Sequence, residues 1–310
     1  MAPVDFKERL LTNLGGDFPK SPNLNIRQLK VEQKDGYRLE WILYDSEPED
    51  SIPAILLVPD NVDPDNPAPG VCVWHQHNGQ WHLGKTEPAG LAGNSMHHTG
   101  VALVKLGFVV LCPDALGFEQ RAEGFKLQAG ALERFLYLKY VVRGKTMAWK
   151  NIVDMRAAVD CLAGRDDVQS DRLGCYGHSM GSTHAYMVGP WEERLKAIVC
   201  NCCLPTYEAI EENEILHCFP NYVTGIYPEA DTPDIASLIA PRALHMNFGE
   251  LDGGSPIKQV REALPKIKRV YESMHAEDNF SYFIEKETGH VLSDAMWHRT
   301  KEFFVKHLMS

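Results

Sequence analysis

The sequence predicts an α/β fold built on a mostly parallel, twisted sheet, with antiparallel strands at its N-terminal end and helices on both faces. Short β-type runs separated by turn residues come first, and short apolar runs alternating with helical segments follow. The 310 residues, 44% of them hydrophobic, suffice for a large core. With no internal repeat detected, a single domain over residues 1–310 is expected.

The antiparallel strands are expected at residues 26–31, 37–44 and 54–58. The sequence Lys34-Asp35-Gly36 is typical of a turn between the first two. These runs predict a meander that leads into the rest of the sheet.

The parallel strands are expected from residue 71 onward. Their apolar runs are nearly continuous rather than alternating, which is typical of strands covered on both faces. Two helices have a clear apolar face, one over residues 151–162 and one over residues 294–308. The strands are expected at residues 71–74, 108–112, 173–176, 197–200, 243–248 and 282–284.

Two segments fit this alternation poorly, residues 122–146 and 204–240. Each lies between a predicted strand and the next core element. We expect insertions there to form a small cap over the carboxyl ends of the strands, where open α/β sheets keep their sites.

The net charge of −11 argues against nucleic acid as a partner, because phosphate binding needs a concentrated basic surface. The chain has no apolar stretch of signal-peptide or membrane-span length, so we expect a cytoplasmic protein that does not bind membranes. Its eight cysteines mostly lie in apolar runs and are expected to be free thiols. The expected partner is a small-molecule ester, and a homodimer is left open.

The segment with the clearest chemical meaning is Gly177-His178-Ser179-Met180-Gly181. An apolar strand precedes it and a helical segment follows, which is the setting that a Gly-x-Ser-x-Gly nucleophile turn requires. Such a turn exposes the serine hydroxyl on a strained backbone at a helix N-terminus, where negative charge is stabilised. We predict that Ser179 is a catalytic nucleophile.

A serine hydroxyl needs a base, and the base needs an acid to orient it. Asp252 lies in a turn-rich loop just past the strand at residues 243–248, and Glu250 in the same loop is the rival acid. The last strand leads into the loop that carries His290, the predicted general base. Further histidines inside or beside helices are interpreted as surface residues: His275, His298 and His307.

The oxyanion of an acyl-transfer reaction needs two hydrogen-bond donors. The backbone N–H of Met180 is one, because it directly follows the nucleophile. The other is expected from the loop after the first parallel strand, at the N–H of His77 or of Gln76.

The same loop is rich in histidine and tryptophan. We predict that the substrate is contacted by His75, Gln76, Trp81 and Glu87, and that Glu87 also hydrogen-bonds one of the imidazoles beside it. His75 and His77 would face the same way on a strand, but no Asp or Cys nearby completes a persuasive ligand set, so no metal is expected.

With these motifs the sequence resembles the α/β-hydrolase superfamily, and within it the dienelactone-hydrolase-like and acetyl xylan esterase-like families. The resemblance covers the chain from about residue 26 onward. It implies an α/β-hydrolase fold and an acyl hydrolase without a cofactor. The supporting segments are His75-Gln76-His77-Asn78-Gly79, Pro113-Asp114-Ala115-Leu116-Gly117-Phe118, the turn at Ser179, Ala240-Pro241-Arg242, residues 249–252 and Gly289-His290.

Two features depart from those families. Dienelactone hydrolases use a cysteine nucleophile where this chain has Ser179, and acetyl xylan esterase-like loops read His-Gly where this chain has His75-Gln76. The resulting prediction is a serine esterase that cleaves a small carboxylic ester or an O-acetyl group through an acyl-enzyme. The alternatives are hydrolysis of a lactone, an activated C–C bond, or a small amide or peptide on the same triad. A binding protein on a decayed hydrolase scaffold would show a damaged triad, whereas all three members are present.

Overall fold

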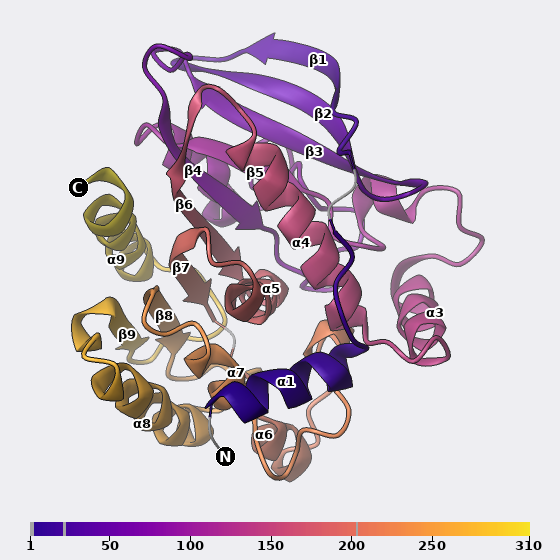
Figure 1. Ribbon diagram of the computed structural model, residues 1–310, viewed down its shortest axis with the longest axis vertical. Helices are drawn as coiled ribbons and strands as arrows, with labels where there is room; N and C mark the ends of the chain where they lie inside the picture. The colour runs from indigo at the N-terminus through magenta and orange to yellow at the C-terminus, as the bar shows by residue number, and fades with distance from the viewer. Residues whose placement is uncertain (1–2, 21–22, 203) are drawn as a thin grey trace.

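A nine-stranded sheet organises the chain, with strand order β1-β2-β3-β5-β4-β6-β7-β8-β9. The computed structural model describes residues 3–20, 23–202 and 204–310 (Figure 1). Its strands are β1 (Arg27–Gln33), β2 (Tyr37–Glu47), β3 (Asp50–Pro59), β4 (Ala68–Trp74), β5 (Val109–Pro113), β6 (Val168–His178), β7 (Leu195–Asn201), β8 (Ala243–Gly249) and β9 (Phe280–Glu285).

The pairing of neighbouring strands changes from antiparallel to parallel once across the sheet. Strands β1, β2 and β3 pair antiparallel, and β3 also pairs antiparallel with β5. From β5 through β4, β6, β7 and β8 to β9 every pairing is parallel. The predicted N-terminal meander and mostly parallel sheet are therefore confirmed. All residues of β4, β5 and β8 are buried, which explains their continuous apolar sequence.

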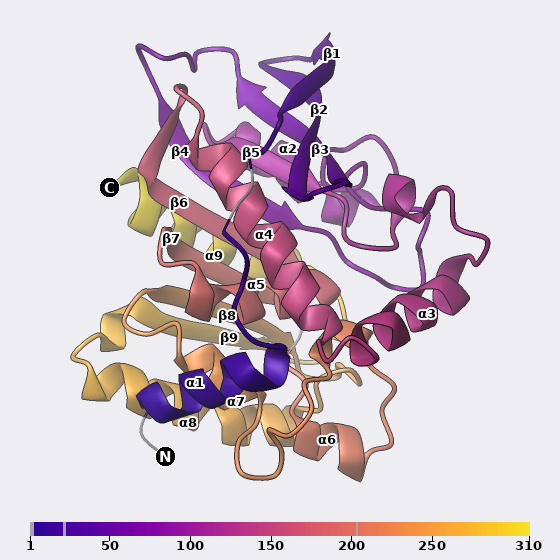
Figure 2. The same cartoon turned by 45° about the vertical axis from the view of Figure 1, so that its right-hand side comes forward.

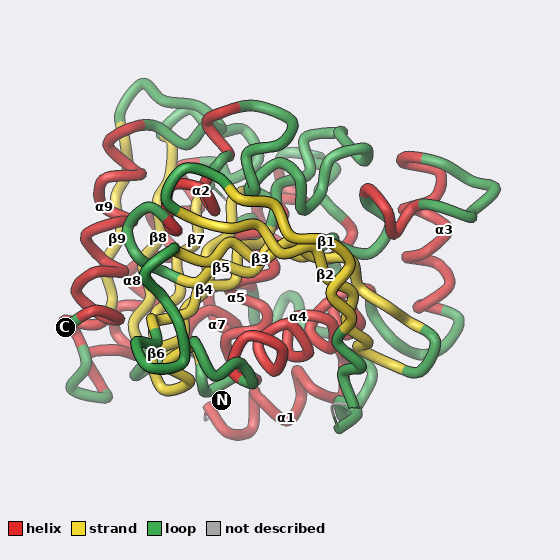
Figure 3. Tube along the Cα trace, turned by 90° about the horizontal axis from the view of Figure 1, so that it is seen from above, coloured by secondary structure: helices red, strands yellow, loops and turns green. Residues whose placement is uncertain are grey.

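Helices cover both faces of the sheet, as predicted (Figures 1 and 3). The described helices are α1 (Pro3–Leu14), α2 (Thr99–Val104), α3 (Ala129–Val141), α4 (Met147–Ala163), α5 (Met180–Val188), α6 (Tyr207–Glu212), α7 (Thr232–Ser237), α8 (Ile257–Ser273) and α9 (Asp294–Phe304). Apolar side chains of α2 and α9 pack into one core cluster, and those of α1, α4, α5, α7 and α8 pack into a second cluster on the opposite face.

The two clearest helix predictions differ from the structure at their ends. Helix α4 begins four residues before the predicted start at 151, because the side chain of Thr146 accepts a hydrogen bond from the N–H of Trp149 and caps the helix. Helix α9 ends at Phe304, and a π-type turn continues the chain from Val305 to Met309. The sequence pattern includes that turn because its Leu308 is also buried.

The predicted cap segments behave differently from each other. Residues 122–146 contain α3, which stands out from the body of the molecule in all three overall views (Figures 1, 2 and 3). In the second segment, Phe219 stacks on Tyr137 of α3 with ring centroids 4.7 Å apart. In its later part, α7 buries Ile235 and Ala236 in the main core. The bounds of the cap segments stay a prediction.

None of the helices in the described part of the chain has both the length and the apolar character needed to cross a bilayer. The seven cysteines for which the structure gives a position are free thiols, and Cys203 lies outside the described residues.

Candidate active site

Ser179 lies in the sharp turn between β6 and α5. Its backbone adopts φ 57° and ψ −117°, a conformation that non-glycine residues rarely take. Such strain persists only where the surrounding structure enforces it. The side chain is at the carboxyl edge of the sheet, next to the first turn of α5.

The two glycines of the motif explain how the turn closes. A Cβ atom on Gly177 would lie 1.8 Å from the carbonyl oxygen of Gly181, and one on Gly181 would lie 2.0 Å from that of Trp74. No side chain fits at either position. Glycine is needed here because strand, helix and the end of β4 approach each other at backbone contact distance.

The structure brings Ser179, His290 and Asp252 together from three different loops. Nε2 of His290 lies 2.8 Å from Oγ of Ser179, and Nδ1 of His290 lies 2.8 Å from Oδ2 of Asp252. The other carboxylate oxygen of Asp252 accepts the N–H of Gly254 at 2.9 Å. The side chain of Asp252 is 2% exposed and that of His290 is 36% exposed, so the carboxylate is shielded while the imidazole can reach a substrate.

The rival acid, Glu250, lies outside this arrangement. Its carboxylate pairs with Arg261 at 2.8 Å and accepts the N–H of Glu287 at 3.4 Å. Of the three histidines interpreted as surface residues, His298 pairs with Glu302 on α9, and His307 packs on Phe303 in the C-terminal turn.

The predicted oxyanion donors come from two adjacent backbone segments. Met180 is the first residue of α5, and first-turn N–H groups of a helix have no partner within the helix. A Cβ on Gly181 would also lie 3.0 Å from the carbonyl oxygen of His75, so the loop after β4 lies directly against the start of α5. Gln76 and His77 follow in that loop. The choice between their N–H groups as second donor stays a prediction.

The side chains of His75 and Gln76 support this loop from inside. His75 donates from Nδ1 to the carbonyl oxygen of Gln76 at 2.8 Å and accepts the N–H of Ala115 at Nε2, at 3.0 Å. Burial lowers its pKa, so the ring is neutral at pH 7. The amide of Gln76 donates to Glu87 at 2.9 Å and to Gln80 at 3.0 Å. Both side chains are buried, and their contact with substrate stays a prediction.

The expectation that Glu87 bonds an imidazole is wrong. Its carboxylate accepts from the side chain of Gln76 and from the N–H of Asn94, at 2.9 and 3.1 Å. The side chain is 1% exposed. Glu87 therefore joins the loop after β4 to the segment before α2, and a contact between Glu87 and substrate stays a prediction.

His77 and Trp81 instead meet a residue of α3 that sequence reasoning missed, Glu133. One carboxylate oxygen of Glu133 accepts from Nε2 of His77 at 2.8 Å and from the indole N–H of Trp81 at 3.0 Å. Nδ1 of His77 accepts the N–H of Gly79 at 2.9 Å, which assigns the proton to Nε2. Helix α3 is thus fastened to the predicted oxyanion loop.

A row of imidazoles leads from the triad into the protein. The ring of His178 lies 5.1 Å from that of His290 and 4.7 Å from that of His97, measured between centroids. Burial, together with the neighbouring rings of His97 and His290, lowers the pKa of His178 well below its usual value. In the described part of the chain, no group of three His, Cys, Asp or Glu side chains is arranged to hold a metal ion.

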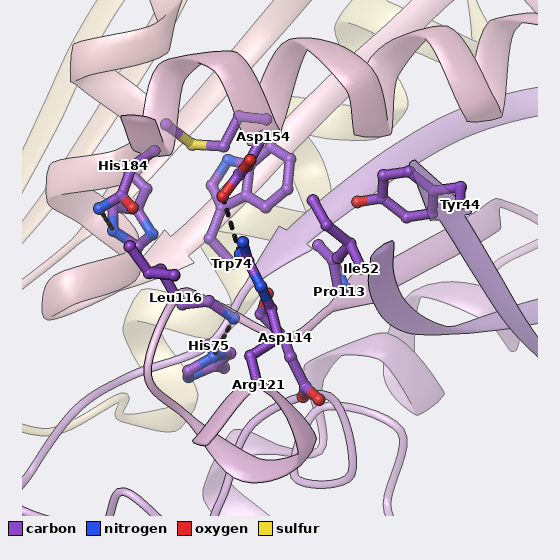
Figure 4. Close-up of a pocket in the computed structure, with 13 residues that line it drawn as sticks. Tyr44, Ile52, Trp74, His75, Pro113, Asp114, Leu116, Arg121, Asp154 and His184 are labelled. Carbon is purple, nitrogen blue, oxygen red and sulfur yellow. Dashed lines mark hydrogen bonds and ion pairs between the residues drawn. The ribbon is translucent and has the colours of Figure 1, made fainter. Parts of the chain in front are cut away.

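A small cavity lies beside the start of the loop after β4 (Figure 4), and Ser179, Asp252 and His290 are not among the residues that line it. Its volume is ≈ 20 Å³, room for about one water molecule. His75 and Trp74 form part of its wall, and Arg121 pairs there with Asp154 at 2.8 Å. This cavity is too small for an ester substrate. The residues around it therefore support the loop rather than hold a substrate in the cavity.

Comparison with known proteins gives the family. Residues 52–218, more than half of the chain, match the dienelactone hydrolase family. The chain belongs to this family. A relative from Bacillus subtilis (strain 168), named "Putative hydrolase YtaP", is 28% identical over 307 residues, which cover 97% of this chain and 99% of the relative.

Two solved structures share the fold. A "putative acetyl xylan esterase (BF1801)" from Bacteroides fragilis NCTC 9343 has a TM-score of 0.72 and 17% identity, over 91% of this chain and 74% of its own. A glucuronoyl esterase from Solibacter usitatus has a TM-score of 0.67 and 15% identity, over 97% and 90%. The α/β-hydrolase fold is thereby confirmed, and family membership confirms the predicted class of carboxylic ester hydrolase.

Several residues around the triad escaped the sequence analysis: Glu133, His178, His97, His217 and Asn201. A signal existed for two of them. His178 is inside the nucleophile motif, and Asn201 is a polar residue at the carboxyl end of an apolar strand, where sites of such sheets lie. The others belong to loops and helices whose directions no local pattern predicts.

Proposed function

We propose that this protein hydrolyses small carboxylic esters, O-acetyl esters included, through an acyl-enzyme on Ser179. The observation that carries the proposal is the continuous hydrogen-bonded chain from Ser179 through His290 to Asp252, with both bonds at 2.8 Å. Such a chain can activate a hydroxyl nucleophile. The printed names of the structural relatives, an acetyl xylan esterase and a glucuronoyl esterase, support an ester as the substrate.

Acylation follows from this geometry. Ser179 Oγ attacks the ester carbonyl while Nε2 of His290 takes its proton, and Asp252 stabilises the imidazolium through Nδ1–H. The carbonyl oxygen becomes an oxyanion that the N–H groups of Met180 and of His77 or Gln76 stabilise. The intermediate collapses when His290 returns the proton to the leaving alkoxide, which departs as the alcohol.

Deacylation repeats the steps with water. His290 takes a proton from a water molecule that attacks the acyl-enzyme, and a second oxyanion forms in the same place. The imidazolium then protonates Ser179 Oγ as the acid product leaves. Each cycle consumes one water and restores the free serine.

A lactone is a second candidate substrate, favoured by membership of the dienelactone hydrolase family. The chemistry is unchanged, except that alcohol and acid stay in one product. Mass analysis of products from a lactone and from an acyclic ester distinguishes the two.

Labelling with a fluorophosphonate probe tests the nucleophile. We expect the wild-type protein to be labelled, and Ser179→Ala to lose both labelling and turnover of p-nitrophenyl acetate, by on the order of 10⁴-fold or more. Ser182→Ala is the matched control, because Ser182 is buried one turn further along α5, and it should keep both. Labelling that survives in Ser179→Ala would contradict the proposal. Comparison with longer acyl esters and p-nitroanilides measures the preference for small esters over amides.

A further inference from the structure

Asn201 is a buried polar residue next to the nucleophile turn. It is the last residue of β7, paired in register with His178 of β6, and its exposure is 0%. The residues before it in β7 are mostly apolar and buried. Burying an amide in such surroundings costs free energy unless its polar atoms are hydrogen-bonded. The side-chain nitrogen of Asn201 has such partners, whereas its Oδ1 has none among the described residues, so the bonds of the nitrogen show what the residue does.

Those partners belong to the nucleophile turn and to the loop of His290. The backbone carbonyl of Asn201 accepts the N–H of Ser179 at 2.9 Å. Its side-chain amide nitrogen donates to Nδ1 of His178 at 2.7 Å and to the carbonyl oxygen of Val291 at 3.4 Å. Val291 directly follows His290. Asn201 thus contacts both the turn that carries Ser179 and the loop that carries His290.

The side-chain contact also sets the state of His178. The amide is oriented by Val291, because a carbonyl oxygen can only accept, so its NH₂ group faces both partners. Nδ1 of His178 is then an acceptor, and the neutral ring carries its proton on Nε2. This ring packs against His290. Asn201 therefore holds an uncharged ring of fixed orientation against the general base.

Other contacts fasten the remaining loops of the triad. The N–H of Leu251 donates to the carbonyl oxygen of Thr288 at 2.8 Å, which joins the Asp252 loop to the His290 loop. The thiol of Cys202 donates to Val291 at 3.1 Å, which adds a weaker bond beside that of Asn201.

We propose that Asn201 is a positioning residue, whose side-chain amide joins the nucleophile turn to the loop of His290 and keeps the imidazole within hydrogen-bonding distance of Ser179. This inference rests on the proposed function, since it concerns the same triad. Loss of the amide should weaken catalysis through displaced geometry, for which a shift of about 1 Å can cost ~10²-fold in rate. The backbone bond to Ser179 is retained in every variant.

The experiment compares Asn201→Ala and Asn201→Asp with Asn247→Ala. Asn201→Asp keeps the volume and removes both donors, in case the alanine variant folds poorly. Asn247 is the matched control, because it pairs with Asn201 in register, is also 0% exposed, and donates to Thr300 and Met296 of α9 rather than to the triad loops. All variants are assayed with p-nitrophenyl acetate below their unfolding temperatures.

We expect both Asn201 variants to lose ~10²-fold in kcat, with KM changed by less than about threefold and with fluorophosphonate labelling slowed in parallel. Asn247→Ala should keep its kcat despite a similar loss of stability. If the wild-type protein is active and both Asn201 variants keep its kcat, this inference alone is overturned. An equally large loss of kcat in Asn247→Ala would also overturn it alone. A wild-type protein that neither reacts with the probe nor hydrolyses esters would overturn the proposed function and this inference with it.

Discussion

Ser179 shows how a single residue depends on its immediate neighbours. Its positive φ costs about 1–3 kcal/mol, and the turn keeps it because Gly177 and Gly181 allow the three backbone segments to touch. The N–H of Ser179 donates to Asn201 on the adjacent strand, which ties the strained residue to the sheet. The strain is thus supported by backbone contacts on all sides.

Replacing Gly177 by alanine should therefore prevent the turn from closing. The new Cβ would lie 1.8 Å from a backbone oxygen that has no room to move, so we expect the free energy of unfolding to fall by about 3 kcal/mol or the protein not to fold. Chemical denaturation measures this. Gly253→Ala is the control, since no atom lies within 4 Å of its added Cβ. Equal stability of the two variants would show that the contact at Gly177 is easily relieved.

The choice between the two candidate acids can also be tested by substitution. Asp252→Asn should lower kcat by about 10⁴-fold, because the imidazole loses the carboxylate that orients it. Glu250→Gln should leave kcat within about twofold, because it removes only an ion pair with the exposed Arg261. Steady-state kinetics with p-nitrophenyl acetate separates the two. The reverse order of effects would make Glu250 the acid.

At the scale of elements, the contact between α3 and the loop after β4 is the feature with a functional consequence. Glu133 hydrogen-bonds both His77 and Trp81 from this helix, and its second carboxylate oxygen is buried without a hydrogen-bond partner in the described residues. Gly130 of the same helix lies close to the ring of Trp81. Helix α3 otherwise packs through Leu132, Leu136 and Tyr140. The position of a protruding helix and that of a predicted oxyanion loop are therefore coupled.

Glu133→Ala should lower kcat by roughly tenfold. This is less than the 10² to 10³ lost when an oxyanion donor is removed, because the N–H group is displaced rather than deleted. Glu133→Gln should fall between, since its amide oxygen can still accept one bond. The exposed Glu123, in the same insertion, supplies the control variant Glu123→Ala. A Glu133→Ala variant with the wild-type kcat would show that the position of the loop does not depend on its contact with the helix.

At the scale of the whole molecule, buried histidines dominate the expected response to acid. Burial lowers the pKa of His184 to about 3 and that of His245 to about 4, from a usual value of 6.5. The unfolded chain binds protons at these imidazoles below pH 6.5, and the folded chain does not. Each therefore lowers the free energy of unfolding by about 1.4 kcal/mol per pH unit as the pH falls from 6.5 toward its folded pKa.

Two buried carboxyls, Asp114 and Asp231, have a raised pKa and act in the opposite direction. Burial raises the pKa of Asp114 to about 7, against the attraction of Lys85, so its contribution to stability is present below the unfolded pKa and is lost as pH rises through 7. Burial also lowers the pKa of His75, His178 and His217, so the imidazoles outnumber these two carboxyls.

We therefore expect the unfolding temperature to fall between pH 7 and pH 5, which calorimetry over that range measures. His184→Gln should make the slope shallower, whereas His298→Gln should leave it unchanged because His298 is 66% exposed. Stability that is constant or rises toward pH 5 would contradict this account.

The sequence by itself determined the strand pattern, the nucleophile turn and the order of Ser179, Asp252 and His290 along the chain. These features can be predicted from the sequence because each depends on a short stretch of residues. A buried parallel strand needs a continuous apolar run, and a turn at backbone contact distance needs glycine at fixed positions. Topology then places the carboxyl ends of parallel strands at one edge, so residues just past those ends are sound candidates.

Only the tertiary structure decided which side chains face one another. Glu133 meets His77 across 56 residues, and the amide of Asn201 meets His178 across 23. Glu87, expected beside an imidazole, points to Gln76 and Asn94 instead. The direction of a side chain on a loop is set by the elements packed around it, and no local periodicity encodes those elements. The chain order of the predicted triad can be read from the sequence, whereas the distances between its members arise from packing.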